Sequence, residues 1–317
     1  MKPVDINIRR RAFGGETDVQ AMMALSRAFS ADNLHVVDLP YRLSSWALDD
    51  PGNIVLWVDA GGQLVAWAVM QTPFWTVDYA CHPTGGSDLN RQVLDWADQR
   101  ARQALHTASG RPCWFVTPFA TQTERIRDLE RAGFACQSDV GEDSWSKVLM
   151  QRRALMPVAE RTLPGGFAIR PLAGENEIEA YVQLHRAAFG SENMTPEWRA
   201  RVLRRPEHRP ELDLVATAPD GQLAAFCISW LHRGSGGQCS GQIEPLGVHE
   251  DYRGLGLGRA ILGEALRRLH CCGADTVYVE TDLQRTEALS LYKAMGFRVL
   301  QDVWVYRKDY ADTRGSR

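Results

Sequence analysis

The stretch of the chain best suited to chemistry is a glycine-rich turn in its C-terminal half. Arg253 precedes three glycines at alternate positions, Gly254, Gly256 and Gly258, and an amphipathic helix is expected directly after them. Without Cβ atoms, such a turn lets phosphate oxygens approach backbone N–H groups. Those groups belong to the first turn of a helix, whose positive end favours anions. Arg253 adds a forked cation, so the stretch predicts a pyrophosphate site.

The spacing of the glycines separates the possible phosphate ligands. A Walker A loop needs Gly-Lys followed by Ser or Thr, and this pair is absent. A dinucleotide fingerprint needs a third glycine where Arg259 or Ile261 stands, although Glu280 ends the next expected strand as a ribose-binding acid would. The turn does match R-x-x-G-x-G followed by alanine, from Arg253 to Ala260. Here the chain resembles the GNAT superfamily of acetyl-CoA-dependent N-acetyltransferases.

A second motif downstream strengthens this resemblance. Apolar and aromatic residues recur at helical spacing on one face, at Ala288, Leu291, Tyr292 and Met295. Gly296 is expected to end this helix before a strand begins. The stretch is similar to the A-x-x-L-Y-x-x-x-G-F element of the same superfamily, and it follows the glycine turn in the order that the family shows.

The elements that must position these motifs predict an α/β fold with a mixed sheet and helices on both faces. Expected strands cover 168–170, 212–217, 223–230, 242–248, 276–281 and 303–307. An apolar stripe over 178–188 predicts a helix, and Leu262, Ala265, Leu266 and Leu269 mark the buried face of the helix after the glycine turn. Antiparallel strands come first and a β-α-β unit follows.

The first half of the chain repeats this plan at an offset of about 160 residues, which indicates a duplicated domain. Gly62–Trp67 corresponds to Gly221–Phe226, and Ala132–Phe134 corresponds to Met295–Phe297. We therefore expect two tandem GNAT-like domains, at 1–150 and 165–317, with a linker over 151–164.

The first copy lacks the chemistry of the second. Where the second has its arginine and glycines, the first has Gly85–Leu89, in which no arginine is present and Asp88 would repel a phosphate. Leu129 stands where the second copy has Tyr292. We expect a degenerate first copy that supplies packing or a wall of the substrate site, and a catalytic second copy.

The resemblance implies where acetyl-CoA would bind. In the family, the strand before the glycine turn pairs with the pantetheine arm, and one of its N–H groups faces the thioester carbonyl. The implied binding residues are Leu246, Val248, Arg253, Gly254, Gly256, Gly258 and Arg259. One position departs from the pattern, because relatives often carry asparagine where this chain has Arg285. That side chain would instead reach a phosphate or solvent.

Two side chains are candidates for the proton transfers. Tyr292 matches the family tyrosine that protonates the departing thiolate, and the alternative is a core aromatic. A phenol, with a pKa near 10, is a plausible donor to a thiolate of pKa near 8.5. The acceptor amine must lose a proton, and Glu244 is the candidate base because alternation places it on one face with Leu246 and Val248. Glu280 and a water chain are the other candidates.

Composition restricts the partners. A net charge of −3 gives no reason to expect nucleic acid or an anionic membrane as partner. The chain has no apolar run of membrane-spanning length and no signal-peptide pattern at Met1–Asp5.

Seven scattered cysteines without a C-x-x-C pair fit reduced thiols in the cytoplasm. The histidines show no metal-binding spacing, so we expect no metal. Cys239 has nucleophile-elbow spacing but lies in an expected loop, which disfavours that role.

Three functions fit these observations. The first is N-acetyltransfer from acetyl-CoA to a primary amine of a small molecule, by direct attack in a ternary complex. The second is a more specific enzyme that resembles mycothiol synthase, or one that acetylates proteins. The third is a non-catalytic acyl-CoA-binding regulator, which the presence of both Tyr292 and Glu244 disfavours. The sequence predicts neither the acceptor nor an oligomeric state.

Overall fold

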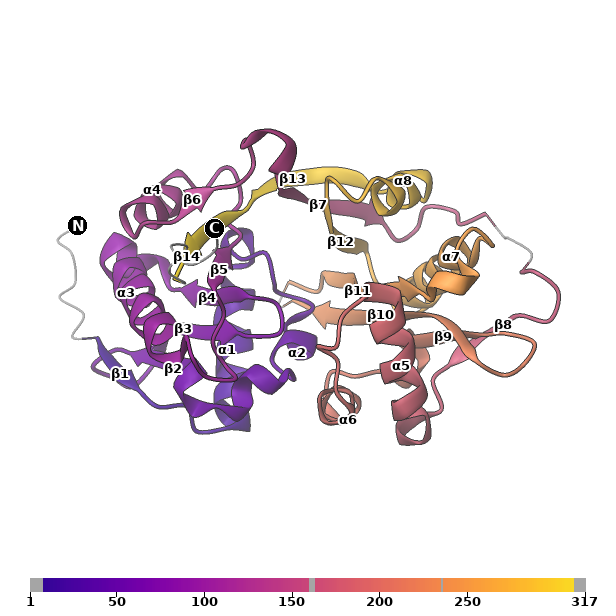
Figure 1. The fold of residues 1–317 in the computed structure, drawn as a ribbon, viewed down its shortest axis with the longest axis horizontal. Coiled ribbons are helices and arrows are strands. Elements are labelled where there is room, and N and C mark those ends of the chain that lie inside the picture. Colours follow the sequence, from indigo (N-terminus) through magenta and orange to yellow (C-terminus); the bar gives the residue numbers. More distant parts are fainter. Residues whose placement is uncertain (1–7, 160–162, 235, 311–317) are drawn as a thin grey trace, which may run out of the picture. The chain divides into compact units, whose positions relative to one another are not determined.

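The protein, seen here as a computed structural model, forms two mixed sheets of seven strands each with helices packed on them (Figure 1). The structure describes residues 8–159, 163–234 and 236–310. Contacts divide the chain into two compact units. Unit 1 consists of Met1–Val36, Ser45–Lys147 and Gln301–Arg317, and unit 2 of Val37–Ser44 and Val148–Leu300. The expected α/β fold with two tandem GNAT-like halves is confirmed.

Unit 1 is built on a sheet with the strand order β1-β2-β3-β4-β5-β14-β6. Its strands are β1 (Arg9–Arg11), β2 (Ile54–Val58), β3 (Leu64–Gln71), β4 (Thr76–Cys81), β5 (Cys113–Val116), β6 (Ala135–Cys136) and β14 (Tyr306–Asp309). Its α-helices are α1 (Glu16–Ala28), α3 (Gly86–Ala104) and α4 (Thr123–Arg131). The β4–β5 pair is parallel, and β1 to β4 form an antiparallel series.

Unit 2 has the sheet order β13-β7-β12-β11-β10-β9-β8. Its strands are β7 (Ser146–Arg153), β8 (Ala168–Pro171), β9 (Asp213–Thr217), β10 (Leu223–Arg233), β11 (Cys239–Val248), β12 (Thr276–Asp282) and β13 (Arg298–Trp304). Its α-helices are α2 (Leu39–Arg42), α5 (Ile178–Phe189), α6 (Pro196–Arg204), α7 (Leu257–Cys271) and α8 (Thr286–Ala294). The first two residues of β7, Ser146 and Lys147, and the last four residues of β13, 301–304, belong to unit 1.

The two repeats exchange their last strands. Strand β14 comes from the second half of the sequence yet lies between β5 and β6, whereas β7 comes from the first half and lies between β12 and β13. The prediction of one final strand over 303–307 is therefore wrong. Strand β13 ends at Trp304 and β14 begins at Tyr306, because the chain leaves one sheet and joins the other at the buried Val305.

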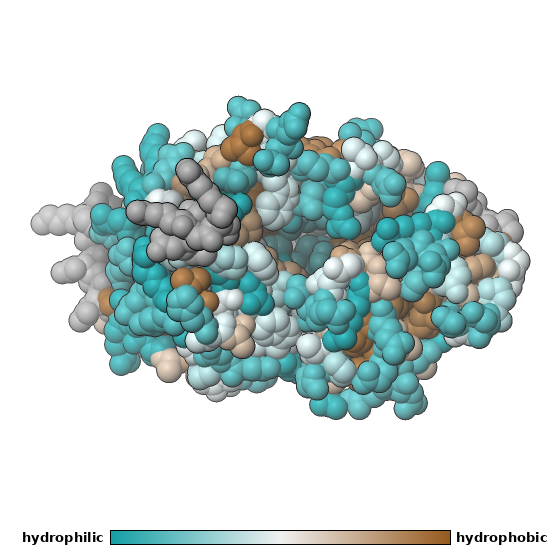
Figure 2. Space-filling view, viewed as in Figure 1, coloured by the Kyte–Doolittle hydropathy of each residue, from teal (hydrophilic) through white to brown (hydrophobic). Residues whose placement is uncertain are grey.

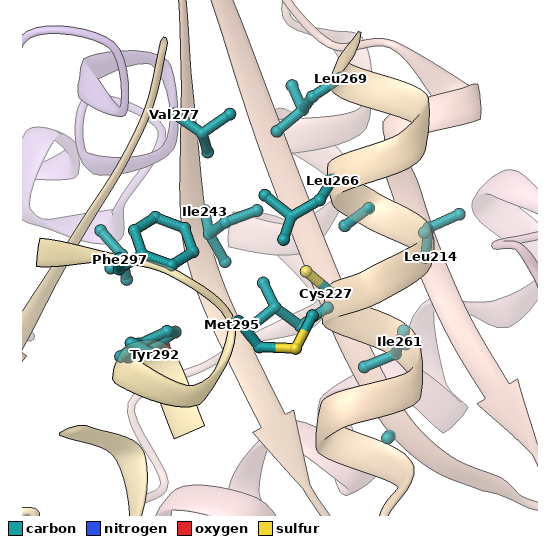
Figure 3. Close-up of a cluster of buried hydrophobic side chains, with 14 of the residues drawn as sticks. Leu214, Cys227, Ile243, Ile261, Leu266, Leu269, Val277, Tyr292, Met295 and Phe297 are labelled. Carbon is teal, nitrogen blue, oxygen red and sulfur yellow. The ribbon is translucent and has the colours of Figure 1, made fainter. Parts of the chain in front are cut away.

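Each unit has its own hydrophobic core. In unit 2, the α7 face that the sequence predicted is confirmed, since Leu262, Ala265, Leu266 and Leu269 are fully buried. They pack with side chains of β10, β11 and β12, as in the cluster of Figure 3. Strand β7 adds Val148 and Met150 to this core. In unit 1, β14 adds Tyr306 to the corresponding core, so each exchanged strand is an integral part of its sheet.

The visible face of the molecule is mostly hydrophilic, with only scattered hydrophobic areas (Figure 2). Within the described ranges, no helix is both long and apolar enough to span a bilayer.

Candidate active site

A cavity of about 670 Å³ lies in unit 2 at the end of β11. It is bounded by the last residues of β11, the glycine turn, the first turn of α7, the start of α8 and the last residues of α5. All seven predicted acetyl-CoA-binding residues line it: Leu246, Val248, Arg253, Gly254, Gly256, Gly258 and Arg259. The structure thus brings together residues that the sequence grouped by motif.

The cavity opens where two parallel strands separate. Strand β11 pairs with β12 only from Ser240–Gln242 to Thr276–Tyr278, whereas β10 follows it as far as Val248. The backbone edge of Leu246 and Val248 is therefore not covered by β12. A free strand edge of this kind can exchange main-chain hydrogen bonds with an extended ligand.

The glycine turn has the geometry that its sequence predicts. Gly254 and Gly256 both have φ of +79°, a conformation that other residues rarely adopt. A Cβ on Gly258 would lie 3.3 Å from Val248 Cγ2, so this position also keeps the cavity wall open. The first intrahelical hydrogen bond is Ala260 N–H to the Gly256 carbonyl, at 3.1 Å. The N–H groups before it have no partner in the helix, and no acidic residue lies in this first turn.

Arginines supply positive charge around the cavity. The Arg253 Nη2 atom donates to the Ala188 carbonyl at 2.9 Å, near the C-terminus of α5. Arg285 also lines the cavity, and its guanidinium carbon lies 5.8 Å from the centre of the Phe189 ring. The position at which the chain departs from the family pattern therefore faces the same space as the glycine turn.

Tyr292 lies in the last turn of α8, and it is 7% exposed. Its ring packs edge-on against Phe297, with centroids 5.7 Å apart, within the cluster of Figure 3. Burial raises the pKa of the phenol, Cys227 and Glu244 raise it further, and Arg285 opposes them. The hydroxyl is therefore protonated at neutral pH, as an unperturbed phenol also is, and the raised pKa makes it a weaker acid.

Glu244 lies at an irregularity in β11. The register with β10 shifts between Ile243, which faces Ser229, and Leu246, which faces Cys227. Burial nevertheless alternates along this part of the strand, with Glu244, Leu246 and Val248 partly exposed and the residues between them buried. The main chain is held there by Trp230, whose Nε1 donates to the Glu244 carbonyl at 2.7 Å. Neither Tyr292 nor Glu244 lines the cavity, so their catalytic roles stay predictions.

Unit 1 has a smaller cavity, of about 350 Å³, at the start of α3 and α4. Helix α4 and helix α8 are each followed by a glycine of positive φ, Gly133 and Gly296. Aligning the helices on these glycines places Arg125 where unit 2 has Ala288. Arg125 lies over the Tyr79 ring, 4.0 Å from its centre, and its Nε donates to the Tyr79 hydroxyl at 2.9 Å.

Two further features distinguish this unit 1 cavity. Asp88 in the first turn of α3 forms an ion pair with Arg91. When the buried faces of α3 and α7 are aligned, Asn90 takes the position of Gly258, and its Nδ2 donates to Asp128 Oδ2 at 2.9 Å. Side chains thus bridge α3 to α4 and α4 to β4 where the unit 2 cavity is open.

Cys239 and His249 could also do chemistry, but neither lines the unit 2 cavity. Cys239 begins β11 and is buried, so its expected place in a loop is wrong, and burial raises the pKa of its thiol. His249 precedes the short 3-10 helix η8 (Glu250–Tyr252), and its Nδ1 accepts from the Asp251 N–H. In the part of the chain that the structure describes, no group of three or more His, Cys, Asp or Glu residues could hold a metal ion.

A buried polar cluster on α5 and α6 was not predicted. The Arg199 Nη2 atom lies 2.5 Å from Asp213 Oδ2, with both side chains almost fully buried. The His185 Nε2 atom lies 3.3 Å from the Tyr41 hydroxyl. Tyr41 lies in the first half of the sequence but belongs to unit 2, and this long separation hides the contact from sequence patterns.

Comparisons with known proteins identify the family of the chain. A model of the acetyltransferase (GNAT) family matches residues 178–297. A mycothiol acetyltransferase from Stackebrandtia nassauensis is 31% identical over 270 residues, which cover 82% of this chain and 84% of the relative. Another, from Salinispora tropica, is 32% identical over 159 residues, 48% of this chain, and this match spans only about half, 52%, of the relative.

A solved structure supports the tandem fold. A tandem GNAT protein from the clavulanic acid biosynthesis pathway is 14% identical, with a TM-score of 0.64, and the match covers 97% of this chain and all of that one. The chain belongs to the GNAT superfamily of N-acetyltransferases, of the tandem-domain type.

Proposed function

We propose that this enzyme transfers an acetyl group from acetyl-CoA to a primary amine of a small molecule, by direct attack in a ternary complex. The unit 2 cavity carries this proposal, because it combines a free strand edge, an anion-binding helix start and arginines. The strand edge would bind the pantetheine arm. The glycine turn, Arg253 and Arg259 would bind the pyrophosphate.

The reaction needs two proton transfers. The amine nitrogen attacks the thioester carbon, the C–S bond breaks, and the sulfur leaves as a thiolate. We propose that Glu244 takes the proton from the amine, directly or through water, and that Tyr292 gives a proton to the thiolate. The position of Tyr292 in α8, which matches that of the family tyrosine, supports this role, and its phenol is protonated at neutral pH before the thiolate departs.

Unit 1 has a different proposed role. In unit 1, the positions that keep the unit 2 cavity open are occupied by Arg125 and by the Asn90–Asp128 pair. Asp88 places a carboxylate in the corresponding first helical turn. We propose that the first copy, predicted at 1–150, binds no acetyl-CoA and contributes packing or a substrate wall, while the second copy, at 165–317, performs catalysis.

A specific acceptor is suggested by one comparison. The similarity to the Stackebrandtia nassauensis mycothiol acetyltransferase extends over most of both chains and therefore includes the first copy. This favours the amine that a mycothiol acetyltransferase acetylates as the first compound to test. A protein amine is the second class, because it poses the same chemistry.

An acceptor screen tests the proposal directly. Purified enzyme is incubated with acetyl-CoA and a panel of small amines, the mycothiol acetyltransferase substrate and lysine peptides, and free CoA is measured. We expect release that depends on one small amine and is weakened in Arg253→Ala. Release with peptides alone would contradict the small-molecule assignment, and no release with any amine would contradict the proposed transfer.

A further inference from the structure

Arg152 of β7 is a buried cation that binds only main-chain carbonyls among the described residues. It is 3% exposed. Its Nε donates to the Met295 carbonyl at 2.7 Å, and its Nη2 donates to the carbonyls of Met156 at 2.7 Å and Pro157 at 3.0 Å. A charge that is withdrawn from water without a carboxylate partner is costly, so these hydrogen bonds must serve a particular arrangement of the chain.

One of these contacts is made at the end of the helix that carries Tyr292. Met295 caps the C-terminus of α8, where the helix dipole favours a cation. The Tyr292 carbonyl accepts from Met295 N–H at 3.1 Å and from Phe297 N–H at 3.0 Å. Arg152 therefore holds the turn whose two N–H groups fix the main chain of Tyr292.

The same turn also fixes the Tyr292 side chain. Phe297 packs edge-on against the Tyr292 ring, and Figure 3 shows both rings beside Met295. Gly296 between them has φ of +86°, and a Cβ there would lie 3.4 Å from the Arg152 Nε atom. The guanidinium thus fits against a turn that only glycine can form without strain, and a shift of this turn would move the phenol.

Unit 1 contains a related arrangement without the phenol, in which the cation also forms an ion pair with Asp98. Lys308 of β14 donates from Nζ to the carbonyl of Ala132, which caps the C-terminus of α4, at 2.6 Å. Phe134 N–H binds the Leu129 carbonyl at 3.0 Å, as Phe297 N–H binds that of Tyr292. Each exchanged strand therefore brings one cation to the end of the corresponding helix, but only Arg152 acts on a helix with a reactive side chain.

We propose that Arg152 is a positioning residue that orients the Tyr292 hydroxyl toward the departing thiolate. This inference rests on the proposed role of Tyr292 as the acid. It also assigns a function to the exchange of strands, because the last strand of the first repeat supplies a residue that the reaction in unit 2 requires.

The test uses the full-length enzyme and three variants of the cations that bind the helix ends. Arg152→Met removes the donors, and Arg152→Lys keeps the charge and one donor nitrogen but loses the guanidinium fork. Lys308→Met removes the equivalent contact in unit 1, together with the ion pair to Asp98. A misplacement of about 1 Å in an active site costs on the order of 10²-fold in rate, so we expect a fall of that size in kcat for Arg152→Met. Arg152→Lys should recover part of the rate. Acetyl-CoA affinity should change little in either variant, and Lys308→Met should keep the wild-type kcat.

A double-mutant cycle separates positioning from folding. In a Tyr292→Phe background, the further change Arg152→Met should cost little additional kcat, because the phenol is already absent. An equal loss of kcat with and without the phenol would overturn the positioning role. So would a wild-type kcat in Arg152→Met that accompanies only a lower melting temperature. Should Arg152→Met not fold, the same cycle is read with Arg152→Lys.

The two assignments can fail separately. If Tyr292→Phe keeps full turnover, the acid role is wrong and the positioning role falls with it. If Tyr292→Phe loses turnover while both Arg152 variants keep it, only the positioning role is overturned.

Discussion

Tyr292 combines burial with a reactive hydroxyl, and the two properties point to different roles. Its ring belongs to the unit 2 core, whereas its position in α8 matches the family acid. A structural tyrosine would tolerate the loss of the hydroxyl as long as the ring remained. The phenylalanine variant therefore separates the two roles.

Tyr292→Phe should lower kcat by roughly the 10²–10⁴-fold typical of a lost acid catalyst. The affinity for acetyl-CoA should change little, because Tyr292 does not line the cavity. Steady-state kinetics and calorimetric titration measure the two quantities. Tyr278→Phe, in the neighbouring strand β12, is the matched control and should keep its activity. Full turnover by Tyr292→Phe would assign the residue to the core.

Glu244→Gln tests the proposed base. Glutamine keeps the size of the side chain but cannot accept a proton near neutral pH. The plateau of kcat/KM should fall, and the acidic limb of its pH profile should flatten, because that limb reports protonation of the base. If the acidic limb persists unchanged, the titrating group lies elsewhere, and Glu280→Gln in β12 is the next variant to measure.

At the scale of elements, α5 carries a titratable group deep in the structure. His185 is stacked on Phe226 and lies beside Phe189, with ring centroids at 5.5 Å and 4.7 Å. Burial lowers its pKa to about 3, and the charges of Arg199 and Arg186 act in the same direction. In the unfolded chain a histidine titrates near pH 6.5. The pKa of His185 is lower in the folded protein than in the unfolded chain. Its contribution to the free energy of unfolding is therefore complete above about pH 6.5 and is lost as the pH falls toward 3.

His185→Phe should therefore change how stability depends on pH. At pH 7 the variant loses the contact with the Tyr41 hydroxyl, which costs about 1 kcal/mol. Between pH 6.5 and pH 4 it should lose less stability than the wild type, because no buried imidazole must be kept neutral. Urea unfolding at pH 7 and pH 4.5 measures both effects, with the exposed His270→Phe as control. A parallel loss in wild type and His185→Phe would contradict the assigned environment.

The sequence predicted individual helices, strands and turns better than it predicted which of them contact one another. The glycine turn was predictable because Gly254 and Gly256 satisfy a local backbone requirement, and the α7 face because its apolar spacing is helical. The exchange of β7 and β14 was not predictable, because pairing partners are set by long-range contacts that the local pattern of a strand does not show. The register shift at Glu244 and the contact of Tyr41 with His185 likewise depend on chain segments far apart in sequence.

At the scale of the whole molecule, the two units have the same sheet order and differ in their cavities. In unit 2, Ala288 and Gly258 leave the space beside β11 open. In unit 1, Arg125 and Asn90 occupy the corresponding positions and bind neighbouring side chains. We therefore propose that acetyl-CoA binds to unit 2 alone, although both units share the fold.

Calorimetric titration with acetyl-CoA tests this central claim most directly. We expect one site per chain, weakened in Arg253→Ala by about the 1.5–3 kcal/mol of a charge-assisted hydrogen bond. Ala288→Arg, which introduces the unit 1 residue into the unit 2 cavity, should abolish the binding, and the reciprocal Arg125→Ala should leave one site. Two equivalent sites in the wild type, or unchanged affinity in both Arg253→Ala and Ala288→Arg, would contradict the account.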